Sequence, residues 1–369
     1  MSGLRLLADD LTGALDTAAE LVGLAGPVQA FWEGATPPAL PENAALDSGT
    51  RELSLSSAVS IVTALAPSLA GAALAYKKVD SLLRGPTLAE IAACMRAGPW
   101  ERAVLAPAFP YQGRITRGGI QYVRDVQGGW SAVSGDLVEL LRDSGSPAHT
   151  GRLDAPLPRG VSVFDAETDE DLREIATLGQ AAPTPVLWVG AGGLAQALAH
   201  GKQAAATSVL PTPILGLFGS DQAVTADQLA ACGKRWIRLR DGGPAEAAML
   251  AALLREEGKV LVSIQLPSGV ARDDAARQIG AALNRLIQDM ARPGTLIVAG
   301  GETLRGLCIS LGAQSLEIQG RIVPGLPRSV MRGGRWDGVT VVSKSGAFGQ
   351  LNLLHDLLHG NQIPTERIA

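Results

Sequence analysis

The chain has 369 residues, of which 46% are hydrophobic and 18% are charged. This length exceeds one ordinary hydrophobic core and the composition is typical of folded proteins, so we expect two globular domains. The formal net charge is −4 and the basic residues are scattered, which argues against nucleic acid as a partner. No stretch approaches the ~20 apolar residues that cross a membrane, and the three cysteines are widely separated, so we expect a cytoplasmic protein with reduced thiols.

In the N-terminal half, short apolar runs alternate with segments of helical periodicity. Segments 87–96 and 168–178 carry apolar residues three and four positions apart, and Thr168 is a candidate N-cap. Such alternation predicts a parallel sheet flanked by helices. The predicted strands cover residues 4–7, 72–77, 103–107, 161–164 and 185–189.

A change of pattern separates this half from the next. After an Ala-rich helix at 194–200, the stretch 201–213 has small and polar residues and two prolines, without strong periodicity. We therefore predict domains at residues 1–205 and 213–369. The alternation then restarts, so the expected fold class is α/β, with two three-layer domains, mainly parallel sheets and an interdomain cleft. The later predicted strands cover residues 214–218, 260–264, 295–299 and 338–342.

Polar residues directly follow the first predicted strand, at the edge where parallel sheets bind ligands. Asp9 and Asp10 are adjacent, and Thr12 lies in the same turn. Two such carboxylates could bind hydroxyl groups, hold a metal through water, or act as a base and its orienting partner. Helix capping explains the same residues equally well, because Asp and Thr are favoured N-caps.

Two more polar clusters follow apolar runs in this half. Residues 77–84 read Lys-Lys-Val-Asp-Ser-Leu-Leu-Arg, so cations could neutralise a substrate carboxylate while the aspartate accepts a hydroxyl. A solvated charged loop is the competing interpretation. Arg51 could meet an acid group or mark a helix start, and the Pro-rich turn 106–114 could form a wall of the cleft.

Two glycine-rich turns follow predicted strands in the second half. At residues 299–303, Ala-Gly-Gly-Glu-Thr, backbone N–H groups could approach phosphates and the helix N-terminus would add favourable positive charge. Residues 343–349, Ser-Lys-Ser-Gly-Ala-Phe-Gly, could close over a nucleotide. Ordinary strand-to-helix turns explain either segment as well.

Two common nucleotide motifs are poorly supported. No Gly-x-x-x-x-Gly-Lys-Ser/Thr occurs, so the sequence does not support a P-loop. Residues 190–195 match the loose dinucleotide fingerprint, but residues 204–215 contain no Asp or Glu for the ribose. The hypothesis of an NAD-dependent dehydrogenase therefore rests on this turn alone.

Taken in order, these segments resemble the four-carbon acid sugar kinase family, long described as a domain of unknown function. The resemblance covers nearly the whole chain, with departures at Leu82, where the family usually has Thr, and at Ala347, where Gly or Asn is common. The matching motifs are Ala-Asp-Asp-Leu-Thr-Gly-Ala at 8–14, Lys-Lys-Val-Asp-Ser-Leu-Leu-Arg-Gly at 77–85, Ala-Pro-Ala-Phe-Pro from 106, Gly-Ser at 219–220, Gly-Gly-Glu-Thr at 300–303, Pro-Gly-Leu-Pro at 324–327 and Lys-Ser-Gly-Ala-Phe-Gly at 344–349.

The resemblance implies an N-terminal domain that binds an acid sugar such as threonate, erythronate or an oxo-tetronate, and a C-terminal domain that binds ATP. Mg²⁺ should bridge the phosphates while the γ-phosphoryl group passes in line to a substrate hydroxyl. Either Asp10 or Asp80 would accept the hydroxyl proton. The other implied substrate contacts are Asp9, Thr12, Arg51, Lys78, Ser81 and Arg84. The implied ATP contacts are Ser220, Gly300, Gly301, Glu302, Thr303, Gly346 and Gly349.

Besides the dehydrogenase, a non-catalytic protein that binds a sugar acid remains a rival interpretation. Nucleotide preference separates the dehydrogenase from the kinase, and ADP release separates the kinase from the sensor. The expected partners are thus small molecules, an acid sugar and ATP, and a homo-oligomer is compatible with the sequence.

Overall fold

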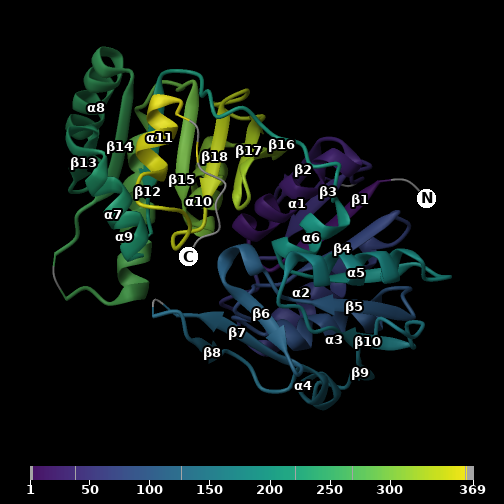
Figure 1. Ribbon diagram of the computed structural model, residues 1–369. Helices are drawn as coiled ribbons and strands as arrows, with labels where there is room; N and C mark the ends of the chain where they lie inside the picture. Colours follow the sequence, from purple (N-terminus) through teal and green to yellow (C-terminus); the bar gives the residue numbers. More distant parts are fainter. Residues whose placement is uncertain are drawn as a thin grey trace. The chain divides into compact units, whose positions relative to one another are not determined.

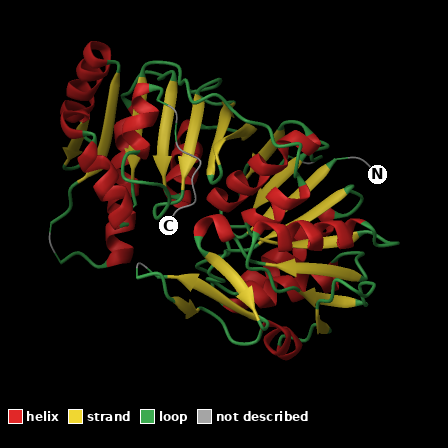
Figure 2. Ribbon diagram, viewed as in Figure 1, coloured by secondary structure: helices red, strands yellow, loops and turns green. Residues whose placement is uncertain are grey.

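The computed structural model describes residues 3–37, 39–125, 127–220, 222–267, 269–361 and 363. The chain divides between Ala204 and Ala205 into two compact units, and each is built of helices and strands (Figures 1 and 2). Within the described ranges, no helix combines the length and the apolar character needed to cross a bilayer.

Unit 1, the N-terminal unit, contains a parallel sheet with strand order β2-β3-β1-β4-β11-β5-β10-β9. The chain leaves β1 toward β2 on one side and leaves β4 toward β5 on the other. Such a divergence opens a crevice at the carboxyl ends of the two strands. The strands are β1 (Leu4–Ala8), β2 (Val28–Phe31), β3 (Ala44–Asp47), β4 (Leu74–Lys78), β5 (Arg102–Ala106), β9 (Ala148–Thr150), β10 (Gly160–Val163) and β11 (Val186–Gly190).

Two helical layers accompany this sheet. In one, α6 packs between α1 and α5; in the other, α3 packs between α2 and α4 (Figure 1). The predicted N-cap is confirmed, since Thr168 and Asp171 form a reciprocal capping box at the start of α5. The helices are α1 (Leu11–Ala25), α2 (Leu55–Leu65), α3 (Thr87–Ala97), α4 (Leu137–Asp143), α5 (Asp169–Gln180) and α6 (Gly192–Leu198), with short 3-10 turns at Ala66–Leu69 and Pro110–Gln112.

A small antiparallel sheet was not predicted from the sequence. It consists of β6 (Arg114–Arg117), β7 (Ile120–Arg124) and β8 (Trp130–Ala132). Its strands are short and polar, so they lack the apolar run by which buried parallel strands are recognised. This sheet supports one wall of the site described below.

Unit 2, the C-terminal unit, has strand order β13-β14-β12-β15-β18-β17-β16, parallel except for β16 and β17. Helix α9 packs against α8 and α10, while α7 packs against α11. The strands are β12 (Ile214–Phe218), β13 (Trp236–Leu239), β14 (Lys259–Ile264), β15 (Thr295–Ala299), β16 (Ser315–Val323), β17 (Leu326–Arg332) and β18 (Thr340–Lys344). The helices are α7 (Ala223–Ala231), α8 (Pro244–Glu257), α9 (Arg272–Gln288), α10 (Gly301–Leu311) and α11 (Leu353–His359), with a 3-10 turn at Gly233–Arg235.

The predicted α/β class is confirmed. Every strand predicted from an apolar run is present, as β1, β4, β5, β10, β11, β12, β14, β15 and β18, and their ends differ from the predictions by at most two residues. The strands that the sequence did not indicate lie mostly at sheet edges or in antiparallel pairs, where one face is exposed and no continuous apolar run is needed.

Candidate functional site

The crevice at the ends of β1 and β4 holds a network of charges. Arg51, in the loop after β3, reaches both aspartates that follow β1. Its Nε and Nη2 donate to Asp9 at 2.8 and 2.9 Å, and its Nη1 and Nη2 donate to Asp10 at 2.7 Å each. Its Nη2 also lies 3.7 Å from Asp80 Oδ1. Three loops that are far apart in the sequence therefore meet around one guanidinium.

Asp10 both caps α1 and contacts Arg51 in the crevice. Its Oδ1 accepts a hydrogen bond from the Gly13 N–H at 2.8 Å and so caps α1. Burial and the neighbouring Asp9 raise the pKa of Asp10. The pKa of Asp9 is lowered, because Arg51 and Lys78 outweigh the effect of its burial. The two adjacent carboxylates thus differ, since the pKa of Asp9 is lowered and that of Asp10 is raised.

Asp80 organises the turn after β4. Arg84 donates to its two oxygens at 2.8 and 2.7 Å, and the Leu82 N–H donates at 3.1 Å. Despite its burial, these hydrogen bonds and the charge of Arg51 hold the pKa of Asp80 well below its usual range. Leu83 adopts a left-handed conformation with φ 55°, which is uncommon outside glycine. The turn is therefore held in an unusual backbone path by one carboxylate.

Lys77 and Lys78 point to opposite faces of the sheet, as neighbours on a strand must. Lys77 Nζ donates to Glu90 on α3 at 2.7 Å, in the buried core. Lys78 is 5% exposed and runs beside Gly13 at the start of α1. Among the described residues no acceptor is bonded to its Nζ. Of these two lysines, Lys78 thus lies in the charged crevice and Lys77 lies in the core.

Two further residues predicted from the sequence differ in their surroundings. Thr12 Oγ1 is buried and has no hydrogen-bond partner in the described part of the chain. The carbonyl oxygen of Ser81 accepts a hydrogen bond from Gln121 Nε2 at 2.8 Å, and Gln121 Oε1 accepts one from Thr116 at 2.7 Å. The small sheet therefore fixes the position of the loop that follows β4.

Asp16 was not among the predicted site residues, although it lies on α1 one turn beyond Gly13. Burial raises its pKa to about 6, although Lys78 and a hydrogen bond from Thr17 oppose the shift. Its spacing of three from Gly13 places it on the face along which Lys78 runs. This helical spacing is the signal that could have found it.

Gly13 is expected to be essential because of what surrounds it. A Cβ at this position would lie 2.6 Å from Asp10 Oδ1 and 2.9 Å from Lys78 Nζ, so Gly13→Ala must displace both groups. We expect kcat/KM to fall by roughly 10- to 100-fold with little change in melting temperature. The matched control is Gly280→Ala in α9, where the new Cβ meets nothing within 4 Å. Equal activities in the two variants would contradict this account of the site.

In unit 2, the loops after β12, β15 and β18 converge at the carboxyl edge of the sheet. A Cβ on Gly346 would lie 2.1 Å from Ser220 Oγ, and one on Gly219 would lie 2.2 Å from Thr303 Oγ1. Gly300 has φ 103°, a conformation that favours glycine. The structure therefore brings together residues from all three loops that the sequence singled out, in a space lined by glycine backbone.

The start of α10 completes this second cluster. The helix begins at Gly301, so Glu302 and Thr303 lie in its first turn, where N–H groups are left without helical acceptors. Gly349 lies apart from that turn, with φ 97°, next to Leu353 and the Gln228 amide. It shapes the loop after β18.

Three residues that the sequence analysis did not assign hold this last loop. Lys344 Nζ donates to Thr225 Oγ1 at 2.8 Å and to the carbonyl oxygens of Ser345 and Gly346 at 3.0 and 3.3 Å. Burial lowers the pKa of Lys344 to about 7. Thr225 also donates to the Gly346 carbonyl at 2.6 Å. Gln228 donates to the carbonyls of Phe348 and Gln350. Thr225 and Gln228 are ordinary helix residues, so no local signal marked them.

At the turn that matched the dinucleotide fingerprint, the space beside the glycines is occupied by other parts of the protein. A Cβ on Gly190 would lie 2.7 Å from the Ala106 carbonyl oxygen, and one on Gly193 would lie 2.6 Å from that of Ala108. Gly192 similarly abuts the Phe109 ring. These glycines permit α6 to pack against the loop after β5, so they do not indicate a pyrophosphate site.

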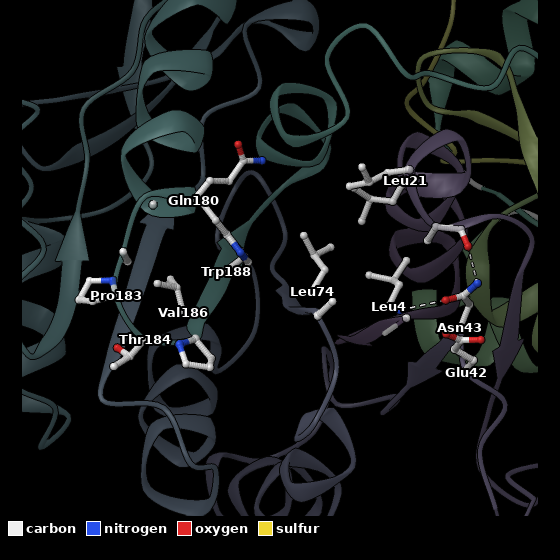
Figure 3. A pocket seen from close by; sticks show the side chains of 17 residues that line it. Leu4, Leu21, Glu42, Asn43, Leu74, Gln180, Pro183, Thr184, Val186 and Trp188 are labelled. Carbon is white, nitrogen blue, oxygen red and sulfur yellow. Dashed lines mark hydrogen bonds between the residues drawn. The ribbon is translucent and has the colours of Figure 1, made fainter. Parts of the chain in front are cut away.

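A pocket of about 630 Å³ lies at the opposite edge of the unit 1 sheet (Figure 3). Its walls are mixed: Leu4, Leu74 and Val186, the first residues of their strands, lie beside polar residues such as Glu42 and Gln180. The Asn43 side chain in its wall already accepts the Leu4 N–H at 2.9 Å. These walls lack the cations that an acidic ligand requires, and the pocket is remote from the charged crevice.

Comparison with known proteins first defines the class. Residues 4–149 and 131–198 match the model of a sugar-binding N-terminal domain, and residues 194–354 match that of a nucleotide-binding C-terminal domain. A structure described as a putative tRNA synthase from Salmonella typhimurium has a TM-score of 0.72 and 21% identity, and the match covers 96% of this chain and 98% of that one. The class is thus a two-domain protein with one sugar-binding and one nucleotide-binding domain.

Curated relatives then identify the family. The D-threonate kinase of Bordetella bronchiseptica is 31% identical over 95% of each chain. The D-erythronate kinase of Heliobacterium modesticaldum is 26% identical over 95% of this chain and 94% of its own. The chain belongs to the four-carbon acid sugar kinase family and is, by that membership, a phosphotransferase with an alcohol group as acceptor.

Proposed function

We propose that the chain transfers the γ-phosphoryl group of ATP, bound by unit 2, to a hydroxyl of a four-carbon acid sugar bound by unit 1. Threonate, erythronate and the oxo-tetronates are the candidate acids, since relatives named for kinases of these acids match much of the chain. The observation that carries the proposal is the crevice in unit 1. There, carboxylates suited to sugar hydroxyls lie beside cations suited to an acid group.

In this proposal the residues around Arg51 hold and orient the sugar. Asp9 and Asp80 remain ionised and accept hydrogen bonds from hydroxyl groups. Lys78 and the unpartnered Thr12 hydroxyl provide donors. Because phosphoryl transfer depends mainly on positioning and on charge neutralisation, a rigid network of this kind suits the reaction.

We assign the base to Asp10 rather than Asp80. Asp10 has a raised pKa, whereas Asp80 has a lowered one because Arg84 and Arg51 stabilise its ionised form. A carboxylate with a higher pKa accepts a hydroxyl proton more readily. Asp80 instead keeps its negative charge and holds the turn after β4 in place.

Asp10→Asn is expected to lower kcat by roughly 10²- to 10⁴-fold, whereas Asp80→Asn is expected mainly to raise the KM for the acid sugar. Because a base must be deprotonated, kcat/KM of the unchanged enzyme should fall as the pH drops through the raised pKa of Asp10. That acidic limb should lie at a higher pH than for an ordinary aspartate. If Asp80→Asn lowered kcat more than Asp10→Asn did, the base would be Asp80 and not Asp10.

The unit 2 cluster fits the phosphates of a nucleotide. Its glycine-lined loops and the free N–H groups at the start of α10 favour bound anions. Mg²⁺ would neutralise charge on those phosphates. The described residues include no group of three or more His, Cys, Asp or Glu side chains placed to hold a metal. In this proposal Mg²⁺ would be held largely by phosphates and water, and Glu302 is the carboxylate of this cluster.

A coupled ADP-release assay over a panel of tetronates and oxo-tetronates tests the proposal. We expect ATP-dependent turnover of at least one acid and no reduction of NAD. Binding of an acid without ADP release would instead support a non-catalytic sensor. Stabilisation by NAD but not by ATP in a thermal-shift measurement would favour a dehydrogenase. The three cysteines are free and buried, which agrees with a reducing compartment such as the cytoplasm.

A further inference from the structure

Arg114 stands out among the cations of unit 1 because part of its guanidinium has no partner. It is the first residue of β6, and its backbone is fixed by a bridge to Phe109 in the loop after β5. Its Nη1 donates to the carbonyl and side-chain oxygens of Gln112. Its Nε is buried, and no acceptor within the described part of the chain is bonded to it.

The small sheet brings Arg114 to the turn after β4. In this sheet β6 pairs with β7, and Gln121 of β7 donates to the Ser81 carbonyl at 2.8 Å. Arg114 accordingly interacts electrostatically with both Asp80 and Arg84. The Arg114 guanidinium therefore lies near the turn after β4, which carries Asp80 and Arg84.

The other two arginines of the crevice are already neutralised. Arg51 is shared between Asp9 and Asp10, and Arg84 is paired with Asp80 through both oxygens. The pKa of each is raised, because the carboxylates outweigh any loss of solvation. Burial instead lowers the pKa of Arg114, since no carboxylate is hydrogen-bonded to it. Arg114 is thus a partly desolvated cation that has no hydrogen-bonded carboxylate among the described residues and feels Asp80 only through its charge.

We infer that Arg114 binds the carboxylate of the acid sugar, with Lys78 as the second unpaired cation. The inference rests on the proposed function and deepens it, because it assigns the acid group to a residue outside the aspartate network. An arginine presents two parallel donors that match a carboxylate, so the free side of the guanidinium suits this ligand. Arg51 and Arg84 then act as positioning residues that hold the neighbouring aspartate carboxylates in place.

Arg114→Met tests the inference, with Arg117→Met as the matched control on the same strand. Arg117 is paired with Glu167 and its side chain is about half exposed. For Arg114→Met we expect the KM for the acid sugar to rise roughly 10- to 100-fold while the KM for ATP stays unchanged. Arg114→Lys should recover part of the loss, because it keeps the charge without the paired donors. Arg117→Met should behave like the unchanged enzyme.

A melting curve of the free protein separates ligand binding from a structural role. Removal of a partly buried cation without a hydrogen-bonded anion should leave the melting temperature of the free protein unchanged or raise it. The increase in melting temperature that the acid sugar causes should become smaller. An unchanged KM for the acid in Arg114→Met would overturn the inference and leave the kinase intact. A fall in melting temperature together with equal rises in the KM values for the acid sugar and for ATP would also overturn the inference.

The same curves keep the two proposals distinct. If the unchanged protein is stabilised by an acid sugar but releases no ADP, the kinase proposal fails while the shift still reports on Arg114. If no acid of the panel stabilises or is turned over, both proposals are overturned.

Discussion

Replacing Lys78 with methionine is expected to abolish most activity while changing the free energy of unfolding by less than about 1.5 kcal/mol, and the same change at Lys77 is expected to do the reverse. The two neighbours on β4 differ in their partners. Lys78 has no hydrogen-bond acceptor among the described residues and adjoins Gly13 in the crevice. Its loss should lower kcat/KM by on the order of 10²-fold, because it neutralises developing or bound negative charge.

Lys77 is fully buried and its Nζ lies 2.7 Å from the 1%-exposed Glu90 side chain. Lys77→Met leaves that carboxylate buried without its partner, which typically costs about 3–5 kcal/mol. The double variant Lys77→Met with Glu90→Leu should recover most of the loss, since two apolar groups replace the pair. Chemical denaturation gives the free energies of unfolding, and the ADP assay gives the activities.

The opposite pattern would contradict this division of roles. The assignment of the two faces of β4 would be wrong if Lys77→Met lost activity but kept its free energy of unfolding. It would also be wrong if Lys78→Met lost stability but kept its activity. The KM for ATP is the internal control, because neither lysine lies in unit 2.

Arg51→Met is expected to have the largest combined effect. The substitution leaves Asp9, which is 3% exposed, and Asp10 adjacent and without their arginine partner, at a cost of about 3–5 kcal/mol in the free energy of unfolding. Activity should fall below detection, because the loops after β1 and β3 lose their common partner. Arg84→Met is the comparison: its side chain is 55% exposed, and the buried Asp80 keeps Arg51 at 3.7 Å and the Leu82 N–H, so a smaller loss is expected.

The cost of Arg51→Met should depend on pH in a defined direction. The pKa of Asp9 is lowered in the folded protein, so its pairing contributes stability above its ordinary pKa, and this contribution is lost as the pH falls through the folded value. The free energy of unfolding of Arg51→Met should therefore lie furthest below that of the unchanged protein near neutral pH, and the two values should converge in acid. Adding Asp9→Asn to Arg51→Met should recover part of the loss at pH 7. A pH-independent difference would contradict the ion-pair explanation.

Much of the framework was predictable because parallel strands are buried on both faces. The apolar runs before Asp9 and Asp80 mark β1 and β4, and the polar residues that follow them must emerge at one edge of the sheet. By contrast, the sheet that carries Gln121 and Arg114 is short, polar and antiparallel, so periodicity gave no indication of it.

The sequence by itself indicated the α/β class and the segments that supply the candidate site residues, and its resemblance to the family implied a sugar-binding and a nucleotide-binding part. Only the tertiary structure decided which charges are paired. Arg51, Arg84 and Lys78 are all candidate cations in the sequence, but only the two arginines form ion pairs with carboxylates among the described residues, while Lys78 acts on the nearby aspartates through its charge alone. Pairing depends on distances between loops that lie dozens of residues apart, and local patterns do not encode those distances. The Asp9–Asp10 turn was foreseeable, but the arginine that neutralises it and the lysine left free beside it were not.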